Sequence, residues 1–463
     1  MSVYEAVFGG DLPDTTAIIS GDEQLSYPQL AENIEDAAAN LFHHGVRPND
    51  VIGIQLANGA DFAVLFHAVL RLGAVVAPLG THLPTSDRDS QLRAVNAKLL
   101  LGLSEARKLR RPRGAHTAPT TRIDPEQLAC LPFSSGTTGT PKAVMLPHRA
   151  LAANVEQFRQ VLPLRPGQTC LSVLPFSHIY GLTALLNVPL ALRARVVAQD
   201  FQRESFIKAH ETHQVDLTFI APPLATLLAN DPLVPRTDFS TLKTVISGAA
   251  PLNPETARAA AERVDARIMQ GFGLTEAAPV THLASQPGLP ISSIGHPLPG
   301  TSISVRHPDT HEPAAEGEMW VRGPQVMAGY LGDPEATTRT LVDGWLRTGD
   351  LVRRNPDGSF EVVDRIKDII KYHGFQVSPV KLERVILDLP DVHDCAVTRG
   401  YDPRGEEQPE AFVVVEPGSP LSAAEIKNWV AAHVAPYERV RAVHLVARIP
   451  RSAAGKILRR QLG

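Results

Sequence analysis

Between Leu131 and Lys142 the chain carries the segment best suited to bind a polyphosphate, LPFSSGTTGTPK. An expected short strand (ACLPF) leads into six small residues, whose size lets backbone N–H groups approach an anion closely. Their hydroxyls add hydrogen-bond donors, and the lysine adds a positive charge. The residues that we expect to bind phosphate are Ser134, Ser135, Gly136, Thr137, Thr138, Gly139 and Lys142.

Other motif types are set aside by spacing. The phosphate segment follows GxxGxxK, has no Ser or Thr after Lys142 and continues into a strand-like AVMLP, so it is not a Walker loop. GFGLTE at Gly271 lacks the third glycine of a dinucleotide-binding fingerprint. His210 and His213 are spaced HxxH with no evident third ligand. We interpret them as part of a solvated helix face rather than as a zinc site.

The elements that must position these motifs alternate between strands and helices. Ser26 and Gln29 form a capping box, which predicts a helix that runs to about His44 and is ended by Gly45. Further along the chain, apolar runs separate segments with helical spacing. The expected strands include 74–79, 215–220, 242–247 and 266–270, and the expected helices include 62–73, 223–230 and 255–264. This alternation predicts an α/β fold with parallel sheets covered by helices.

The pattern changes beyond about Arg365, where strand-like segments at 392–398 and 411–416 alternate with shorter helices. Ser422 and Glu425 predict the start of one helix, and another strand is expected at 441–449. A loop that contains Lys456 is expected to follow this strand and to lead into a last helix. We therefore predict a large N-terminal domain of several subdomains, 1–364, and a small α+β C-terminal lid, 368–463, joined by a hinge at 365–367. A boundary of this kind makes relative motion the default expectation.

Composition limits the function classes. A chain of 463 residues is too long for one ordinary core, and its net charge of −4 indicates neither a nucleic-acid nor an anionic membrane surface. The N-terminus lacks the pattern of a signal peptide, and the apolar stretch 61–80 is interrupted by charged residues. We expect a cytoplasmic protein. Cys130, Cys170 and Cys395 lie far apart beside apolar residues, and we expect all three to be buried.

From the phosphate segment onward the chain resembles the adenylate-forming superfamily of acyl-CoA and aryl-CoA ligases, luciferase-like enzymes and peptide-synthetase adenylation domains. The likeness continues in order through QGFGLTE (270–276), GWLRTGDL (344–351), DRIKDIIKYHGFQVSPVKLE (364–383) and PRSAAGKILRRQL (450–462). LPFSHIYGL, SGAAPL and KYHGFQVSP are most similar to 4-coumarate:CoA ligases. The resemblance implies ATP-dependent formation of an acyl-AMP from a carboxylic acid, followed by transfer of the acyl group to CoA.

The resemblance also implies roles for particular residues. Lys456 and Thr275 would act on the reacting phosphate, Glu276 would hold Mg²⁺, Asp350 and Arg365 would bind the ribose, and Lys367 would be the hinge. His178 would border the carboxylate. The remaining nucleotide-binding residues would be Gln270, Gly271, Phe272 and Gly273. Those of the acyl pocket would be His178, Tyr180, Gly248, Ala249, Gly271, Pro279, Val280 and Gln376, and those of the CoA side would be Lys371, Gly374 and Phe375.

Several alternatives remain open at this point. The acyl acceptor is CoA or the phosphopantetheine of a carrier protein, because both thiols would use the same tunnel. A luciferase-like oxygenase remains possible, whereas LPFSHIYGL lacks the aspartate of an amino-acid-activating domain. A silent nucleotide-binding or acyl-binding module would be expected to lack residues such as Lys456 and Asp350. The sequence is compatible with a monomer or a homodimer, and it favours an aryl or arylpropenoic acid, with a medium-chain fatty acid next.

The chain departs from the family pattern at a few places. It is shorter than typical coumarate ligases before the phosphate segment, and Phe272 replaces the usual tyrosine, which removes a hydroxyl but keeps an aromatic surface for adenine. Ala143 replaces a glycine after Lys142. Basic residues within 107–113 are interpreted as a solvated loop, with a docking patch for the 3′-phosphate of CoA as the alternative.

Overall fold

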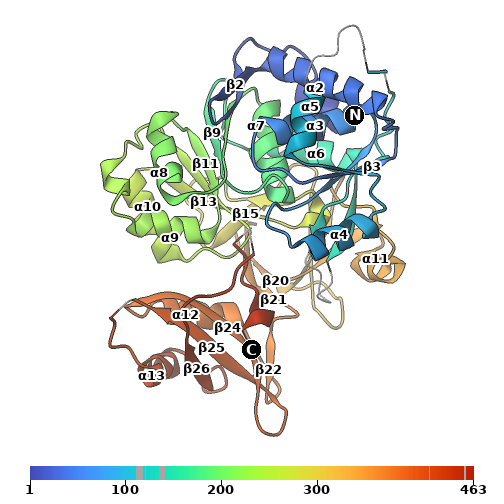
Figure 1. Ribbon diagram of the computed structural model, residues 1–463. Coiled ribbons are helices and arrows are strands. Elements are labelled where there is room, and N and C mark those ends of the chain that lie inside the picture. Colours follow the sequence, from blue (N-terminus) through green and yellow to red (C-terminus); the bar gives the residue numbers. More distant parts are fainter. Residues whose placement is uncertain (111–117, 120, 135–140, 417, 453–454, 463) are drawn as a thin grey trace.

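The computed structural model places two large sheets above a smaller C-terminal domain (Figure 1). The residues that the structure describes are 1–110, 118–119, 121–134, 141–416, 418–452 and 455–462. The predicted α/β class, with a large N-terminal part and a small α+β C-terminal domain, is confirmed.

The larger sheet combines a parallel part and an antiparallel part. In the described part of the chain its order is β16 (Ser302–Arg306), β17 (Glu316–Arg322), β20 (Trp345–Arg354), β21 (Phe360–Arg365), β15 (Ser293–Pro297), β14 (Val280–Leu283), β13 (Arg267–Gly273), β12 (Thr244–Ser247), β11 (Leu217–Ile220), β9 (Thr169–Ser172), β10 (Arg195–Ala198), β1 (Thr16–Ser20) and β2 (Glu23–Ser26), with β19 (Leu341–Val342) beside β20. The strands from β13 to β1 run parallel, and those from β14 to β16 run antiparallel.

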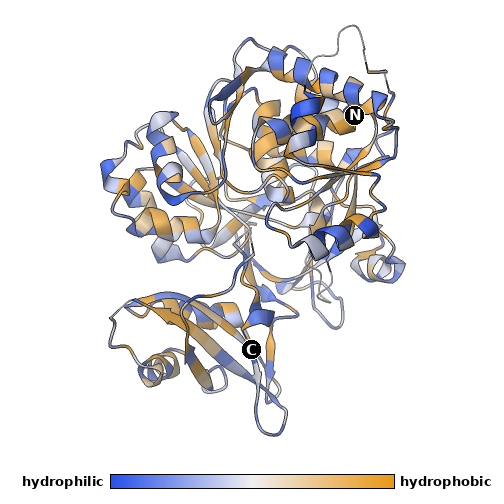
Figure 2. Ribbon diagram, viewed as in Figure 1, coloured by the Kyte–Doolittle hydropathy of each residue, from blue (hydrophilic) through white to orange (hydrophobic). Residues whose placement is uncertain are grey.

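Helices cover both faces of the parallel part, which explains its sequence. In Figure 1, α8 (Arg203–Thr212), α9 (Pro222–Asn230) and α10 (Pro254–Val264) lie on one side of β11 and β13, and α7 (Val188–Ala191) lies on the other. Every residue of β11 and β12 is buried. A strand covered on both faces favours a continuous apolar run over an alternating one, and Figure 2 shows apolar residues gathered on these central elements.

The second sheet presents the phosphate segment. Its order is β18 (Gly329–Tyr330), β8 (Lys142–Pro147), β6 (Leu128–Cys130), β4 (Val75–Pro78), β3 (Val51–Ile54) and β5 (Leu99–Leu101), with β7 (Phe133–Ser134) beside β8. The surrounding helices are α1 (Val3–Phe8), α2 (Tyr27–His43), α3 (Ala60–Arg71), α4 (Thr85–Ala94), α5 (Leu103–Leu109) and α6 (His148–Arg159). Because β7 ends and β8 begins at this segment, Ser134 and Lys142 pair with each other as its flanking residues.

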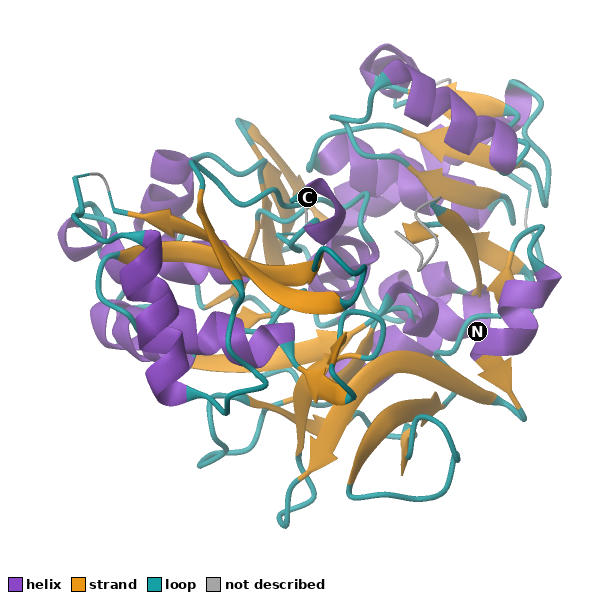
Figure 3. Ribbon diagram, turned by 90° about the horizontal axis from the view of Figure 1, so that it is seen from below, coloured by secondary structure: helices purple, strands orange, loops and turns teal. Residues whose placement is uncertain are grey.

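The C-terminal domain has its own core. Its elements are the hairpin β22 (Ile370–Tyr372) and β23 (Phe375–Val377), the sheet of β24 (Val392–Tyr401), β25 (Glu407–Val415) and β26 (Ala442–Leu445), the helices α12 (Pro379–Leu387) and α13 (Ala423–His433), and the 3₁₀ turn η4 (Arg459–Gln461). Buried apolar side chains from Ile370 to Val440 form one cluster, separate from the cluster that extends from Val3 to Phe360. Seen from below, this domain lies in front of the larger part (Figure 3).

Most local predictions are confirmed. The capping boxes at Ser26 and Ser422 begin α2 and α13, and the strands expected at 215–220, 242–247 and 266–270 pair in parallel. All three cysteines are buried. Among the described residues, no helix is both long enough and apolar enough to cross a lipid bilayer.

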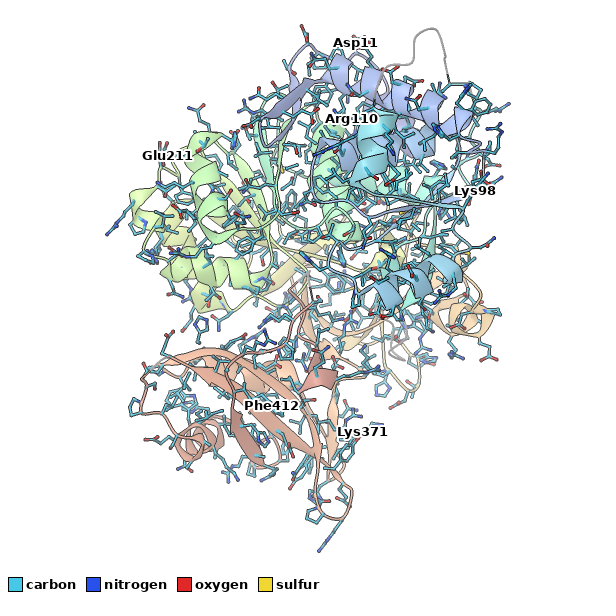
Figure 4. All side chains as sticks on the ribbon, in the orientation of Figure 1. Asp11, Lys98, Arg110, Glu211, Lys371 and Phe412 are labelled. Atoms are coloured by element: carbon cyan, nitrogen blue, oxygen red, sulfur yellow. The ribbon has the colours of Figure 1, made fainter. Side chains whose placement is uncertain are left out.

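Three local interpretations are wrong. His210 is not on a solvated face; it is buried beside Phe206 and Phe239, and its Nδ1 lies 2.9 Å from the Phe206 carbonyl oxygen. The last helix expected after Lys456 is only the turn η4. Arg110, labelled in Figure 4, is not a free basic residue. Its side chain is ion-paired with Glu23 of β2 and Asp61 of α3. Arg111 and Arg113 lie outside the described residues.

Candidate functional site

A cavity of about 780 Å³ opens where the two large sheets meet the C-terminal domain. Predicted site residues from all three parts line it. They are Ser134, Lys142, His178, Tyr180, Gly248, Ala249, Gly271, Phe272, Gly273, Thr275, Glu276, Pro279, Val280, Arg365, Lys367 and Lys456. The fold therefore collects in one place residues that are more than 300 positions apart in the sequence, from 134 to 456.

Asp350 lies just behind this lining. It faces Arg365 directly across the antiparallel pair β20 and β21, and its Oδ1 is 2.8 Å from the arginine Nε. The carboxylate is only 2 % exposed, and its Oδ2 has no hydrogen-bond partner within the described residues. Burial raises the pKa of Asp350, while Arg365 and Lys456 oppose that rise. A buried carboxylate oxygen without a donor is suited to accept hydroxyl groups of a ligand.

The C-terminal domain contributes Lys456 to the wall of the same cavity. Arg451 donates to the Gly455 carbonyl at 2.9 Å, and the Ser452 N–H donates to the Lys456 carbonyl at 2.8 Å, so the loop is held in shape. Gly455 has a φ of +82°, and a Cβ there would lie 2.9 Å from the Cβ of Ala221 in the residue before α9. A glycine is therefore needed where this loop meets the larger part of the chain.

The ammonium of Lys456 has an unusual electrostatic environment. Burial, followed by the positive charges of Arg365 and Lys367, lowers its pKa to about 8, while Asp350 opposes the shift. Burial and the charge of Arg365 also lower the pKa of Lys367, in the turn after β21. A cluster of cations in a cavity with few compensating carboxylates favours a polyanionic ligand.

His178 lies in the cavity wall at the start of a π-helix, η1 (Gly181–Asn187). Its Nδ1 accepts a hydrogen bond from the Tyr180 N–H at 3.2 Å, so the neutral ring carries its proton on Nε2. Burial and the nearby Lys456 cation lower the pKa of His178 to about 4. The imidazole is therefore neutral at pH 7 and can donate one hydrogen bond through Nε2.

Apolar and small residues form the wall beyond His178. Phe158, Ile246, Val280 and Pro279 line it, and a Cβ on Gly248 would lie 2.9 Å from the phenol carbon and oxygen of Tyr180. Thr183 of η1 donates to the Ala278 carbonyl at 2.9 Å, which ties the π-helix to the loop that carries Pro279. The side chains in this part of the wall are suited to an uncharged organic group.

Glu276 and Lys142 meet around the ring of Tyr330. The Tyr330 hydroxyl donates to Glu276 Oε1 at 2.9 Å, and the Lys142 ammonium lies 5.2 Å from the centre of its ring. Burial and the Glu276 charge raise the pKa of Tyr330. Lys142 also forms an ion pair with Asp333, 2.9 Å away. Neither Tyr330 nor Asp333 was expected from the sequence, because neither lies in a motif that indicates phosphate or metal chemistry.

Some predicted residues lie elsewhere. The Gln270 side chain points away from the cavity, since it donates to the Ile291 carbonyl at 2.6 Å and accepts from the Leu252 N–H at 3.2 Å. The expected CoA-side residues Lys371, Gly374 and Phe375, and Gln376, which was expected in the acyl pocket, belong to the exposed hairpin β22–β23 outside the cavity. Figure 4 shows Lys371 at the edge of the C-terminal domain. Ser135, Gly136, Thr137, Thr138 and Gly139 lie outside the described residues.

Comparison with known proteins assigns the family. A family model described as AMP-binding enzyme matches residues 8–331, and one described as AMP-binding enzyme C-terminal domain matches residues 381–456. The chain belongs to the AMP-binding enzyme family.

Individual relatives agree over nearly the whole chain. 4-Coumarate–CoA ligase 2 of Nicotiana tabacum is 34 % identical over 94 % of this chain and 88 % of its own length. The alignment spans 483 positions, more than the 463 residues of this chain, so the relative carries insertions. The structure of ATP-bound MatB from Rhodopseudomonas palustris has a TM-score of 0.91 with 25 % identity, covering 100 % of this chain and 98 % of that one. The amide bond synthetase McbA from Marinactinospora thermotolerans has a TM-score of 0.88 with 28 % identity, covering 99 % and 98 %.

Proposed function

We propose that this chain is an AMP-forming acid–CoA ligase, which uses ATP to convert a carboxylic acid into an acyl-AMP and then into an acyl-CoA thioester. The observation that carries the proposal is the position of Lys456. Its loop in the C-terminal domain reaches the cavity lined by His178 and Arg365, and Asp350 lies directly behind Arg365. The activity named for the curated relatives is consistent with this arrangement.

ATP would bind with its ribose against Asp350. The partnerless Oδ2 would accept a ribose hydroxyl, while Arg365 would orient the carboxylate and favour its ionised form. The phosphates would lie toward Lys142 and Thr275, and the ring of Phe272 offers an aromatic surface for adenine. In this arrangement the α-phosphate would lie between Lys142 and Lys456.

The residues present fit a magnesium ion at Glu276. Tyr330 occupies only Oε1 of this carboxylate, and Mg²⁺ is commonly held by one or two carboxylates together with substrate phosphates. When bound, the ion would neutralise phosphate charge. Glu276 would hold the ion, and Tyr330 would orient that carboxylate through its hydrogen bond to Oε1.

The acid would bind with its carboxylate near His178 and its organic group along the apolar wall. His178, which is neutral with its proton on Nε2, would donate a hydrogen bond to the carboxylate. We propose an aryl or arylpropenoic acid as the substrate, because Phe158, Val280 and the glycines at 248 and 271 leave an uncharged slot beside Tyr180.

In the first step, a carboxylate oxygen attacks the α-phosphorus and the bond from that phosphorus to pyrophosphate breaks. Negative charge grows on the phosphoryl oxygens and on the leaving group, and Lys456 stabilises that charge. In the second step, the CoA sulfur attacks the acyl carbon, the thiol loses its proton, and the bond to AMP breaks. AMP is a good leaving group, which a free carboxylate lacks.

We also propose the domain division 1–364 and 368–463, with Lys367 at the hinge. The hydrophobic cluster of the larger part ends at Phe360, before this segment, and the cluster of the C-terminal domain begins at Ile370, after it. For thioester formation, the C-terminal domain would turn about Lys367, withdraw Lys456 and bring Lys371, Gly374 and Phe375 to the cavity. The exposed position of the hairpin is compatible with this motion.

The test is a substrate panel resolved by mass. The protein is incubated with MgATP and cinnamic, benzoic, arylacetic and C4–C14 fatty acids, with and without CoA, and acyl-AMP, acyl-CoA and AMP are measured. Formation of acyl-CoA supports the proposal and identifies the acid. Acyl-AMP that accumulates and ignores CoA would contradict the CoA step and direct attention to a carrier-protein thiol. If no acid of the panel yields an adenylate, the proposed substrate classes are wrong.

A further inference from the structure

Glu318 is a buried carboxylate in the cavity wall that the proposed chemistry does not use. It lies on β17 and is 3 % exposed. Its Oε2 accepts hydrogen bonds from Trp320 Nε1 at 2.9 Å and from Arg347 Nη2 and Nε at 2.9 and 3.1 Å. Its Oε1 accepts from the Gly349 N–H at 3.2 Å. A buried charge with four donors is well compensated, so Glu318 can be retained at little cost.

Three of those donors, two from Arg347 and one from Gly349, belong to the irregular stretch of β20 just before Asp350, where the register with β17 shifts. We call this stretch, residues 347–349, the turn. Gly349 adopts a φ of +69°, and Thr348 fixes the other side of the turn by donating to the Met319 carbonyl at 2.8 Å and accepting from the Asp350 N–H at 3.1 Å. Strand β17 therefore hydrogen-bonds the turn through two adjacent residues, by the Glu318 side chain and by the Met319 backbone. Only the hydrogen bonds to Glu318 can be removed by mutation of a side chain on β17.

We propose that Glu318 is a positioning residue that orients the Asp350 carboxylate toward the nucleotide ribose. The carboxylate anchors the Gly349 peptide and the Arg347 guanidinium, and the turn so fixed directs the partnerless Oδ2 of Asp350. This inference rests on the proposed role of Asp350 in ATP binding. Loss of Glu318 would leave the turn with a freed N–H group and an unpaired arginine.

The substitution that tests this most sharply is Glu318→Gln, which preserves the volume of the side chain. A glutamine can still accept from Gly349 through its oxygen, but its amide nitrogen would then face Trp320 and Arg347, which are also donors. The side chain cannot satisfy both groups, so the turn should shift. Arg347→Gln is the second variant, because it removes the partner rather than the carboxylate.

The measurement compares ATP with 2′-deoxy-ATP and 3′-deoxy-ATP in the adenylation half-reaction, followed by pyrophosphate release with the best acid. A hydrogen bond to a charged group corresponds to roughly a tenfold or larger preference for the complete ribose. We expect the wild-type preference in kcat/KM to fall to within about threefold of equality in Glu318→Gln. Asp350→Ala gives the smallest ribose preference to be expected, since it removes the ribose contact altogether.

Glu316→Gln is a matched control. Glu316 lies two positions earlier on β17, on the same side of the strand, but it forms an exposed ion pair with Arg353 away from the cavity. The Glu316→Gln variant should retain both the adenylation rate and the ribose preference. Unfolding temperatures of all variants show whether they are folded.

The outcomes separate the two hypotheses. If Asp350→Ala abolishes the ribose preference and both Glu318→Gln and Arg347→Gln reduce it, Glu318 is a positioning residue. If Glu318→Gln slows all three nucleotides equally while Asp350→Ala abolishes the preference, Glu318 has only a structural role and the inference is overturned. If Asp350→Ala leaves the preference intact, the proposed ribose site itself is wrong, and the inference falls with it.

Discussion

The ammonium of Lys142 lies 2.9 Å from Oδ2 of Asp333, although the two residues are separated by most of the larger domain in sequence. Strand β18 brings them together, because Tyr330 pairs with Val144 of β8 and is followed by the start of α11 (Pro334–Thr340), where Asp333 is the N-cap. The lysine expected to bind phosphate is thus engaged by a carboxylate of the protein itself.

Asp333→Asn should strengthen the binding of ATP. The carboxylate of Asp333 would compete with the ATP phosphates for the Lys142 ammonium, and the substitution removes its charge. Asparagine can still accept a hydrogen bond from the Ala336 N–H and cap α11. Because Asp333 is partly exposed, we expect KM for ATP to fall by no more than about fivefold, with kcat little changed. Steady-state kinetics with varied ATP measures this.

The control for that variant lies outside the cavity. Glu211→Gln removes the exposed pair between Glu211 and Lys208 on α8, neither of which lines the cavity, and it should not affect KM. A rise in KM for Asp333→Asn would mean that the ion pair holds Lys142 ready for phosphate instead of competing with it.

Lys456→Ala should separate the two half-reactions. The ammonium stabilises charge only while the α-phosphate is attacked, so its loss should slow adenylation by at least about 10²–10³-fold. Conversion of synthetic acyl-AMP and CoA to thioester should continue at close to the wild-type rate. Both reactions can be followed separately by mass, and an equal loss in both would contradict the assignment of Lys456 to the first step alone.

The pH dependence of adenylation should reveal Lys456 directly. Burial and the neighbouring cations lower its pKa to about 8, so in the free enzyme the charged form is present below pH 8 and is lost as the pH rises above it. We therefore expect kcat/KM for pyrophosphate release to decline above about pH 8, because this parameter reports the free enzyme. Lys456→Arg should remain charged and move the decline to higher pH. A wild-type profile that stays flat to pH 10 would exclude the lowered pKa.

Local sequence patterns were sufficient for the elements, since capping and apolar periodicity depend on neighbouring residues. They could not show how the elements pair. The antiparallel half of the large sheet joins β15 to β21 across more than 60 residues, and no local pattern indicates that pairing. His210 was misplaced for a related reason: the burial of a polar residue on α8 depends on Phe239, which lies far along the chain.

For the candidate site, most of the described residues that motif resemblance named line the cavity, but the resemblance did not show how they are held. Glu318, Tyr330 and Asp333 act through partners on other strands. One signal was available in the sequence, because Glu318 directly precedes the apolar run Met-Trp-Val, where a buried charge requires a partner. Gln270 was placed in the site by its motif, whereas its actual partners, Leu252 and Ile291, could be found only from the fold.

Gly271→Ala should reshape the acyl slot without disturbing the fold. A Cβ there would lie 3.6 Å from Ile246 and 3.7 Å from Leu283, which are ordinary contacts, so the added methyl group occupies cavity space. We expect kcat/KM for aryl acids to fall by about tenfold or more, with shorter acids affected less. Gly273→Ala is the contrast, since its Cβ would lie 2.1 Å from the Pro279 carbonyl oxygen and should impair every acid. Equal losses for all acids in Gly271→Ala would contradict the slot.

The last prediction concerns Asp364, which joins the two sides of the proposed hinge. This carboxylate, 1 % exposed on β21, accepts hydrogen bonds from the Ser378 hydroxyl at 2.5 Å and from the Val380 N–H at 3.1 Å, at the start of α12. Asp364 precedes Lys367 and is paired with Leu351 in the large sheet, whereas Ser378 and Val380 follow the hinge. Rotation about Lys367 would separate them.

Asp364→Asn should therefore favour the second half-reaction over the first. It keeps the size of the side chain but removes the charge, and hydrogen bonds to charged groups are stronger than those to neutral groups. We expect adenylation to slow by roughly three- to tenfold, and thioester formation from supplied acyl-AMP to be unchanged or faster. Lys367→Pro should have the opposite effect. A proline restricts rotation at the hinge, so adenylation should stay intact and thioester formation should be slowed. If Asp364→Asn slows thioester formation as much as adenylation, its contacts with α12 persist in both steps, and the axis of rotation does not lie at Lys367.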